Sequence, residues 1–150
     1  MRKFFWIFMA IMLTGCVTVK IPKYLQDKFP YQKTYYSPYE ETLTAVRQAL
    51  ADSGWKVSEV SSPMAFEQGE VQKEAEGKQV LIFTEVRQTP LFLSSRYLNL
   101  NAYVRASDDG TDVEIRYLGI TPMLFKHSQN YRNDAVVNKI FDRISELLNQ

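Results

Sequence analysis

Residues 97–105 read YLNLNAYVR and alternate strictly between polar and apolar side chains. This alternation is typical of a β-strand that buries one face. Asp108-Asp109-Gly110 then favours a tight hairpin turn, and residues 111–118, TDVEIRYL, alternate again with Val113, Ile115 and Tyr117 inward. We therefore expect these two strands to pair, and this hairpin decides the fold.

The segments on either side extend the hairpin into a sheet with two helices. Residues 79–88 predict the third strand of an antiparallel meander, residues 55–60 a shorter strand and residues 64–72 a weaker one. Ser37-Pro38-Tyr39-Glu40 predicts a capping box at the start of a helix that Gly54 ends, and residues 131–148 carry the apolar stripe of a second helix. The expected class is α+β: an N-terminal helix, an antiparallel sheet of about five strands and a C-terminal helix, with both helices on one sheet face.

This order of elements loosely resembles the helix-grip domains of the lipoprotein subunit of the outer-membrane β-barrel assembly machinery. The similarity covers residues 37–149 and includes a capped helix that ends at Gly54-Trp55. The chain has no residue motif specific to that protein. The resemblance thus implies the architecture and leaves a role in barrel assembly open.

The N-terminus begins Met1-Arg2-Lys3, continues through ten apolar residues and ends in Leu13-Thr14-Gly15-Cys16. Two positive charges and a short apolar run match a secretory signal peptide, because the run is too short to span a bilayer stably. Leu13, Thr14, Gly15 and Cys16 also resemble the lipobox of bacterial lipoprotein precursors. The alternative is an uncleaved apolar anchor that continues through residues 17–19, with Cys16 an ordinary thiol.

The lipobox resemblance implies that signal peptidase removes residues 1–15. It further implies a diacylglycerol on the Cys16 sulfur and an acyl chain on the new amine, which together hold a protein on a membrane. Val17, and not Asp, follows the cysteine. By resemblance to enteric-type sorting, this favours the periplasmic face of the outer membrane over the inner membrane.

Residues 16–36 are predicted to form the lipid anchor and a tether, and residues 37–150 the globular domain. The segment contains four lysines and two prolines and shows no regular period. Fully extended, it would reach on the order of 60 to 70 Å from the bilayer. Three alternatives stay open: a solvated linker with its last part packed on the domain, a segment that binds head groups or a partner, or a strap on the domain.

Charge and composition exclude several classes of function. Without Arg2 and Lys3, 16 basic side chains remain against 17 acidic ones, so no net positive charge favours nucleic acid. Cys16 is the only cysteine and His127 the only histidine. With Cys16 assigned to the lipid, no disulfide can form within the chain, and with one histidine no His-rich metal site can be built. A Ser-His-Asp set would have to use His127, which lies beside Lys126 in a predicted loop, where we expect an exposed surface residue and not a general base. We expect no enzyme, no metal and no cofactor other than the covalent lipid.

Two similar loops are candidates for an apolar lip. Each follows a strand with Thr-Pro and large apolar residues: Leu91, Phe92 and Leu93 in the first, Met123, Leu124 and Phe125 in the second. In the predicted meander the first and third strands run parallel, so both loops leave the same end of the sheet. They either fold over the open end of the core or contact a partner, an acyl chain or a membrane.

The polar face of the central strands is a candidate partner surface. It comprises Tyr97, Asn99, Asn101, Tyr103, Arg105 and Arg116. Such residues make adaptable contacts at interfaces, although an antiparallel sheet commonly has a polar outer face, and the tyrosine-rich tether could equally cover it.

We therefore expect a lipid-anchored, periplasm-facing binding module of the bacterial cell envelope, with an envelope protein as its partner. The alternative is a carrier or sensor that holds an apolar ligand, such as a lipid or acyl chain, between sheet and helices.

Overall fold

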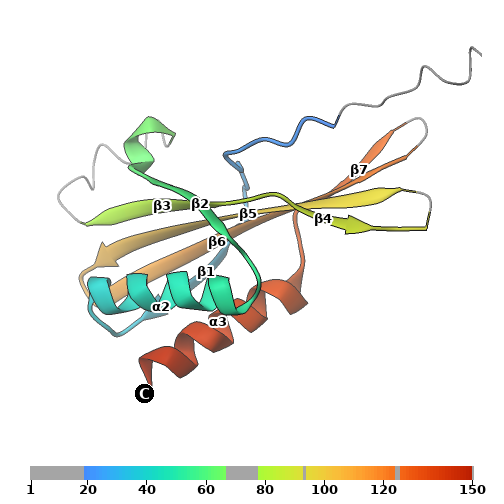
Figure 1. The fold of residues 1–150 in the computed structure, drawn as a ribbon. Helices are drawn as coiled ribbons and strands as arrows, with labels where there is room; N and C mark the ends of the chain where they lie inside the picture. The colour runs from blue at the N-terminus through green and yellow to red at the C-terminus, as the bar shows by residue number, and fades with distance from the viewer. Residues whose placement is uncertain (1–18, 67–77, 93, 124–125, 150) are drawn as a thin grey trace, which may run out of the picture.

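The computed structural model describes residues 19–66, 78–92, 94–123 and 126–149. Within these ranges the chain forms a seven-stranded antiparallel sheet with two long helices on one side (Figure 1). The elements in chain order are β1 (Tyr31–Tyr35), α2 (Tyr39–Asp52), β2 (Val57–Ser61), the 3₁₀ turn η1 (Pro63–Ala65), β3 (Gln79–Thr84), β4 (Arg87–Pro90), β5 (Ser95–Ser107), β6 (Gly110–Pro122), β7 (His127–Asn130) and α3 (Asp134–Leu148). The α+β class is confirmed, whereas the predicted count of about five strands is too low.

The sheet is built around the predicted hairpin of β5 and β6. Its main path runs β1-β6-β5-β3-β2, while β4 pairs with β5 and β7 pairs with β6. The β5–β6 register extends from Tyr97 opposite Ile120 to Ser107 opposite Gly110. The paired region is therefore longer than the alternating residues 97–105 and 111–118. The predicted meander of β3, β5 and β6 is confirmed, and β1 and β2 add a strand on each side of it.

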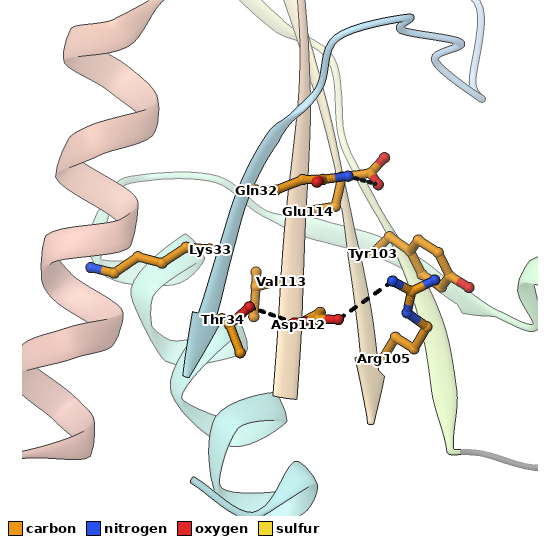
Figure 2. A pocket seen from close by; sticks show the side chains of 8 residues that line it. All are labelled: Gln32, Lys33, Thr34, Tyr103, Arg105, Asp112, Val113 and Glu114. Atoms are coloured by element: carbon orange, nitrogen blue, oxygen red, sulfur yellow. Dashed lines mark hydrogen bonds and ion pairs between the residues drawn. The ribbon is translucent and has the colours of Figure 1, made fainter. Parts of the chain in front are cut away.

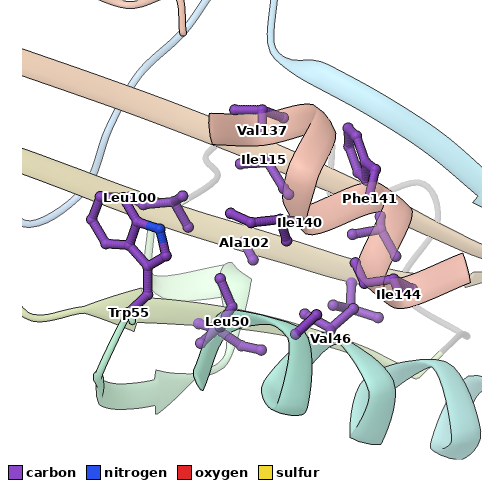
Figure 3. Packing of buried hydrophobic residues seen from close by; sticks show 14 of the residues in the cluster. Val46, Leu50, Trp55, Leu100, Ala102, Ile115, Val137, Ile140, Phe141 and Ile144 are labelled. Carbon is purple, nitrogen blue, oxygen red and sulfur yellow. The ribbon is translucent and has the colours of Figure 1, made fainter. Parts of the chain in front are cut away.

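The hydrophobic core lies between the sheet and the helices (Figure 3). β5 contributes Leu100 and Ala102, and these pack with the other buried members of the cluster, which include Val46, Leu50, Trp55, Ile115, Val137, Ile140, Phe141 and Ile144. Burying a large aliphatic or aromatic side chain contributes about 1.5–3 kcal/mol, so this layer provides most of the stability.

Arg143 of α3 also donates to the Asp52 carboxylate of α2 at 2.7 Å and holds the pKa of Asp52 below its ordinary value.

The helix ends differ in part from their sequence signals. Gly54 has the expected positive φ of 77° just after α2. The predicted capping box is wrong, because Pro38 takes the N-cap position without a side-chain hydrogen bond, and Glu40 instead pairs with Lys78 at 2.6 Å. α3 begins at Asp134 and not at Tyr131, because Asn133 caps it by accepting from the Val136 N–H at 3.2 Å.

The predicted strand over residues 79–88 is interrupted at Glu85 and Val86. β3 and β4 both pair with β5. Phe83 lies opposite Asn101 and Arg87 lies opposite Leu98, so the chain advances four residues where β5 advances only three. One extra residue of this kind is a β-bulge, which reverses the faces beyond it. Arg87 consequently lies on the helix side, where its guanidinium is 4.9 Å from the Trp55 ring centroid. The weaker strand predicted at residues 64–72 is not found at its start, where η1 forms, and residues 67–72 lie outside the described ranges.

The sheet begins before the predicted domain boundary at residue 37. β1 lies within the predicted tether and pairs along β6, with Tyr31 opposite Ile115 and Tyr35 opposite Thr111. Tyr35 is buried in the core and donates from its hydroxyl to the Phe141 carbonyl oxygen of α3 at 3.0 Å. Three exposed polar residues separate Tyr31 from Tyr35, so the segment carries no alternating strand signal.

Candidate functional site

The predicted polar side chains do share the sheet face that points away from the helices. In the β5–β6 register, Asn101 lies opposite Arg116, and Tyr103 lies opposite Glu114. Four of the six predicted surface residues are nonetheless buried: Asn99, Asn101, Tyr103 and Arg116. The chain's own N-terminal segment covers this part of the face.

We call residues 19–30 the strap. It crosses the outer face of the sheet before the chain enters β1, as the blue segment in Figure 1 shows. Asn99 donates to the Pro22 carbonyl oxygen at 2.7 Å, and Asn101 donates to the Lys23 carbonyl oxygen at 3.1 Å. The Asn101 side-chain oxygen also accepts from the Leu25 N–H at 2.7 Å. Asparagine suits this position because one amide both donates and accepts, so it can satisfy the backbone of a crossing segment.

Arg116 holds the middle of the strap. Its guanidinium donates to the Tyr24 hydroxyl at 2.7 Å and to the Leu25 carbonyl oxygen at 3.2 Å, and it pairs with Glu114 on the same strand. It also lies 5.3 Å from the centroid of the Tyr24 ring. A buried arginine needs such partners, because an unpaired buried charge is costly.

Apolar contacts flank these hydrogen bonds on both sides. Leu25 packs with Leu118 and Ile120, and Val19 and Ile21 join this cluster. On the other side, Phe66 stacks on Tyr24 at 5.4 Å between ring centroids and meets the edge of Phe83 at 5.1 Å. The outer face therefore has small cores of its own, and the strap is part of the folded domain from Val19 onward.

The strap leaves open a hollow near the β5–β6 turn, with a volume of about 150 Å³ (Figure 2). Its lining residues are Gln32, Lys33, Thr34, Tyr103, Arg105, Asp112, Val113 and Glu114. Asp112 accepts from the Thr34 hydroxyl at 2.7 Å and pairs with Arg105 at 3.4 Å, while Gln32 donates to Glu114 at 3.2 Å. The hollow thus presents two carboxylates and the Arg105 guanidinium beside β1, at one edge of the sheet, whereas the Lys33 side chain points away from it toward α3 (Figure 2).

Tyrosine side chains of β1 fasten this edge to α3. The Tyr31 hydroxyl donates to Asp134 and accepts from the Asn133 N–H at 2.9 Å. Burial and the bond to Asp134 together raise the pKa of Tyr31 above its ordinary value. Lys33 reaches the Ser145 hydroxyl at 2.9 Å. β1 is consequently a fixed border of the hollow.

The two Thr-Pro segments form hairpin turns. The first joins β4 to β5, where the Leu91 N–H donates to the Ser94 carbonyl oxygen at 2.8 Å, and the second joins β6 to β7, where the Met123 N–H donates to the Lys126 carbonyl oxygen at 2.8 Å. Both lie at the same end of the sheet, because Tyr97 pairs with Ile120 just inside the turns. Phe92 is 98% exposed, and Leu91 and Met123 are exposed as well.

These hairpins extend beyond the helices in Figure 1 and do not fold over the core. Leu93, Leu124 and Phe125, the other residues of the predicted lip, lie outside the described residues. Leu13, Thr14, Gly15 and Cys16 also lie outside them, so the lipid anchor stays a prediction. The described part of the chain contains no helix with the length and apolarity needed to cross a membrane.

His127 is exposed on β7 and has no place in either the strap or the hollow. Among the described residues, no three His, Cys, Asp or Glu side chains are grouped so that they could hold a metal ion. What the outer face offers is hydrogen bonding and charge pairing, together with an exposed apolar end.

Sequence reasoning placed the polar residues on one face but did not identify Gln32, Thr34, Asp112 and Glu114 as neighbours of Arg105.

The comparison of this chain with protein-family models, with curated proteins and with solved structures finds no match.

Proposed function

We propose that this chain is a lipid-anchored, non-enzymatic binding module at the periplasmic face of the bacterial outer membrane, and that it binds an envelope protein through the hollow on the outer sheet face. The observation that carries the proposal is the strap. It starts at Val19, only three residues after the predicted lipidated Cys16, and is fixed across the sheet by Asn99, Asn101 and Arg116.

The short distance from anchor to fold gives the domain a defined position at the membrane. Three residues span at most about 10 Å, far less than the reach expected for a free tether. Val19 packs in the cluster of Leu118 and Ile120, close to the hairpin end of the sheet. The hollow lies towards the opposite end, beside the β5–β6 turn, and would therefore face away from the bilayer.

The chemistry of the hollow suits a polar segment of a partner protein. Arg105 can meet a carboxylate of the partner, while Asp112 and Glu114 can meet a cation or a hydrogen-bond donor. Partly exposed charges contribute orientation and selectivity more than affinity. We therefore expect a modest affinity that depends on salt.

The alternative function as a carrier of an apolar ligand has less support. Its ligand would need space between the sheet and the helices. Leu50, Leu100 and Ile140 are fully buried there in one contiguous cluster. Native mass spectrometry of the extracted protein tests this alternative, since a carrier would retain a noncovalent lipid.

Site-specific photocrosslinking in intact cells tests the binding module. A photoreactive residue replaces Gln32, which is exposed at the hollow, and a matched control replaces Asn138, which is exposed on α3. The expected result is a discrete adduct with one envelope protein at Gln32 that is absent at Asn138. Absence of an adduct at Gln32, or the same adducts at both positions, would contradict the proposal.

A further inference from the structure

The hairpin end of the sheet combines two features. Leu91 and Phe92 are exposed on one hairpin and Met123 on the other, although large apolar side chains are seldom left in water. The strap leads back from the core to this same end, because Val19 and Ile21 pack with Ile120, three residues before Met123. The predicted lipid attachment and the apolar tips therefore lie at one end of the molecule.

The charges of this end are of one sign. The sequence contains no Asp or Glu between residues 86 and 107, or between residues 115 and 133. Arg87, Arg96 and Lys126 lie in or beside the two hairpins and are exposed, and Lys20 at the start of the strap is exposed as well. The acidic residues of the central hairpin, Asp108, Asp109 and Asp112, lie at the other end of the same strands.

We propose that the two hairpin tips at this end of the sheet dock onto an anionic phospholipid bilayer, the same bilayer that receives the acyl chains of Cys16. This inference rests on the lipid anchor of the proposed function and adds a second membrane contact made by side chains. Phe92, Leu91 and Met123 enter the boundary between head groups and acyl chains, where apolar burial is favourable. Arg96 and Lys126 lie just behind them and attract anionic head groups.

Membrane docking gives the domain one orientation. A short lipid anchor sets which end of the domain lies near the bilayer but leaves the domain free to tilt. Two tips and the anchor make three contacts, which hold the strands of the sheet upright on the membrane. The hollow beside Asp112 is then directed into the periplasm.

The test uses the full lipoprotein extracted from membranes and reconstituted into vesicles of phosphatidylethanolamine and phosphatidylglycerol with brominated acyl chains. Because the lipid occupies the thiol of Cys16, a cysteine at Ser94 is the single site for an environment-sensitive fluorophore. The control carries the fluorophore at Asp108, which is exposed in the turn at the other end of the sheet. Flotation of the same vesicles reports whether the protein is anchored.

We expect several-fold stronger quenching at Ser94 than at Asp108. The added substitution Phe92→Ser, or vesicles of phosphatidylcholine alone, should reduce the quenching at Ser94 towards the control value, while the circular dichroism spectrum stays unchanged. Equal quenching at Ser94 and Asp108 in protein that floats would overturn the inference and leave the anchor intact. Protein that does not float would contradict both the anchor and the docking. Neither result depends on the partner crosslinked at Gln32.

Discussion

The side-chain amide of Asn101, on the central strand of the sheet, accepts a hydrogen bond from the backbone N–H of Leu25 at 2.7 Å. The same amide donates to the carbonyl oxygen of Lys23 at 3.1 Å. One buried residue thus binds a segment 76 residues away in the sequence, much as a neighbouring strand would. This contact turns the predicted tether into part of the fold.

Replacing Asn101 with Ala should release the strap. The Leu25 N–H and the Lys23 carbonyl oxygen would lose their partner, and an unsatisfied buried group costs about 1–3 kcal/mol. We expect the free energy of unfolding in urea to fall by about that amount and amide exchange in residues 19–27 to accelerate. Asn138→Ala on the exposed face of α3 is the control and should change neither. Unchanged exchange in the strap of Asn101→Ala would show that this contact does not hold it.

Gly110 should be the least replaceable glycine described. It has a φ of 148°, and a methyl group there would lie 2.2 Å from the Tyr35 carbonyl oxygen of β1. Gly54 also has a positive φ, but its nearest neighbour would be 3.7 Å from the new methyl group. Gly54→Ala should cost about 1–2 kcal/mol from backbone strain alone. Gly110→Ala should cost more, because β1 must also move, and thermal unfolding of the two variants compares them directly. An equal loss would contradict the close approach of β1.

Substitution of two phenylalanines should change the free energy of unfolding by very different amounts. Phe92→Ser at the hairpin tip should change the free energy of unfolding by no more than about 0.5 kcal/mol, because the Phe92 side chain is exposed to solvent. Phe83→Ala should cost about 3–5 kcal/mol, because Phe83 is fully buried beneath the strap. Chemical denaturation measures both. A large loss for Phe92→Ser would place that side chain in a core.

Tyr35 should make the fold sensitive to alkaline pH. Burial raises the pKa of Tyr35 to about 12, against 10.0 for an ordinary tyrosine, with Asp142 adding to the shift and Ser145 opposing it. Because the folded state holds this proton more tightly, the stabilising effect is complete below pH 10 and is lost as the pH rises towards 12. Burial raises the pKa of Tyr31 and Tyr39 too, so part of the alkaline loss remains without Tyr35.

The comparison of wild type with Tyr35→Phe isolates this residue. At neutral pH the variant should lose about 1 kcal/mol, since its bond to the Phe141 carbonyl oxygen is gone. Between pH 10 and about 12 its free energy of unfolding should fall less steeply than that of the wild type. Parallel curves over that interval, obtained from urea titrations, would argue against a buried neutral tyrosine.

The parts of the fold that alternate or follow a helical period could be predicted from the sequence. Residues 97–105 and 111–118 identified β5 and β6, and the stripe through Ile140 and Ile144 identified α3, because a two-layer core imposes a period on its elements. The polar outer face was also found. Its six residues are on the face that the alternation assigned to them.

What the sequence could not predict depends on contacts between distant segments. The strap has no period because it is held by hydrogen bonds to Asn99, Asn101 and Arg116 and not by a repeating apolar face. The bulge at Glu85 and Val86 is set by the pairing of two strands with β5, which a single segment does not encode. β1 could not be predicted because its three middle residues, Gln32, Lys33 and Thr34, are exposed and polar, so the segment resembles a linker.

The most direct test of the account is the intact mass of the protein extracted from bacterial membranes, combined with sequencing of its first residues. We predict a mature chain that begins at Cys16 and carries a diacylglycerol and an amide-linked acyl chain, and we predict that Cys16→Ser is absent from the outer-membrane fraction. The domain from Val19 onward should keep its fold in that variant, because the strap does not use Cys16. A chain that retains residues 1–15, or an unmodified Cys16 in membrane-bound protein, would contradict the account.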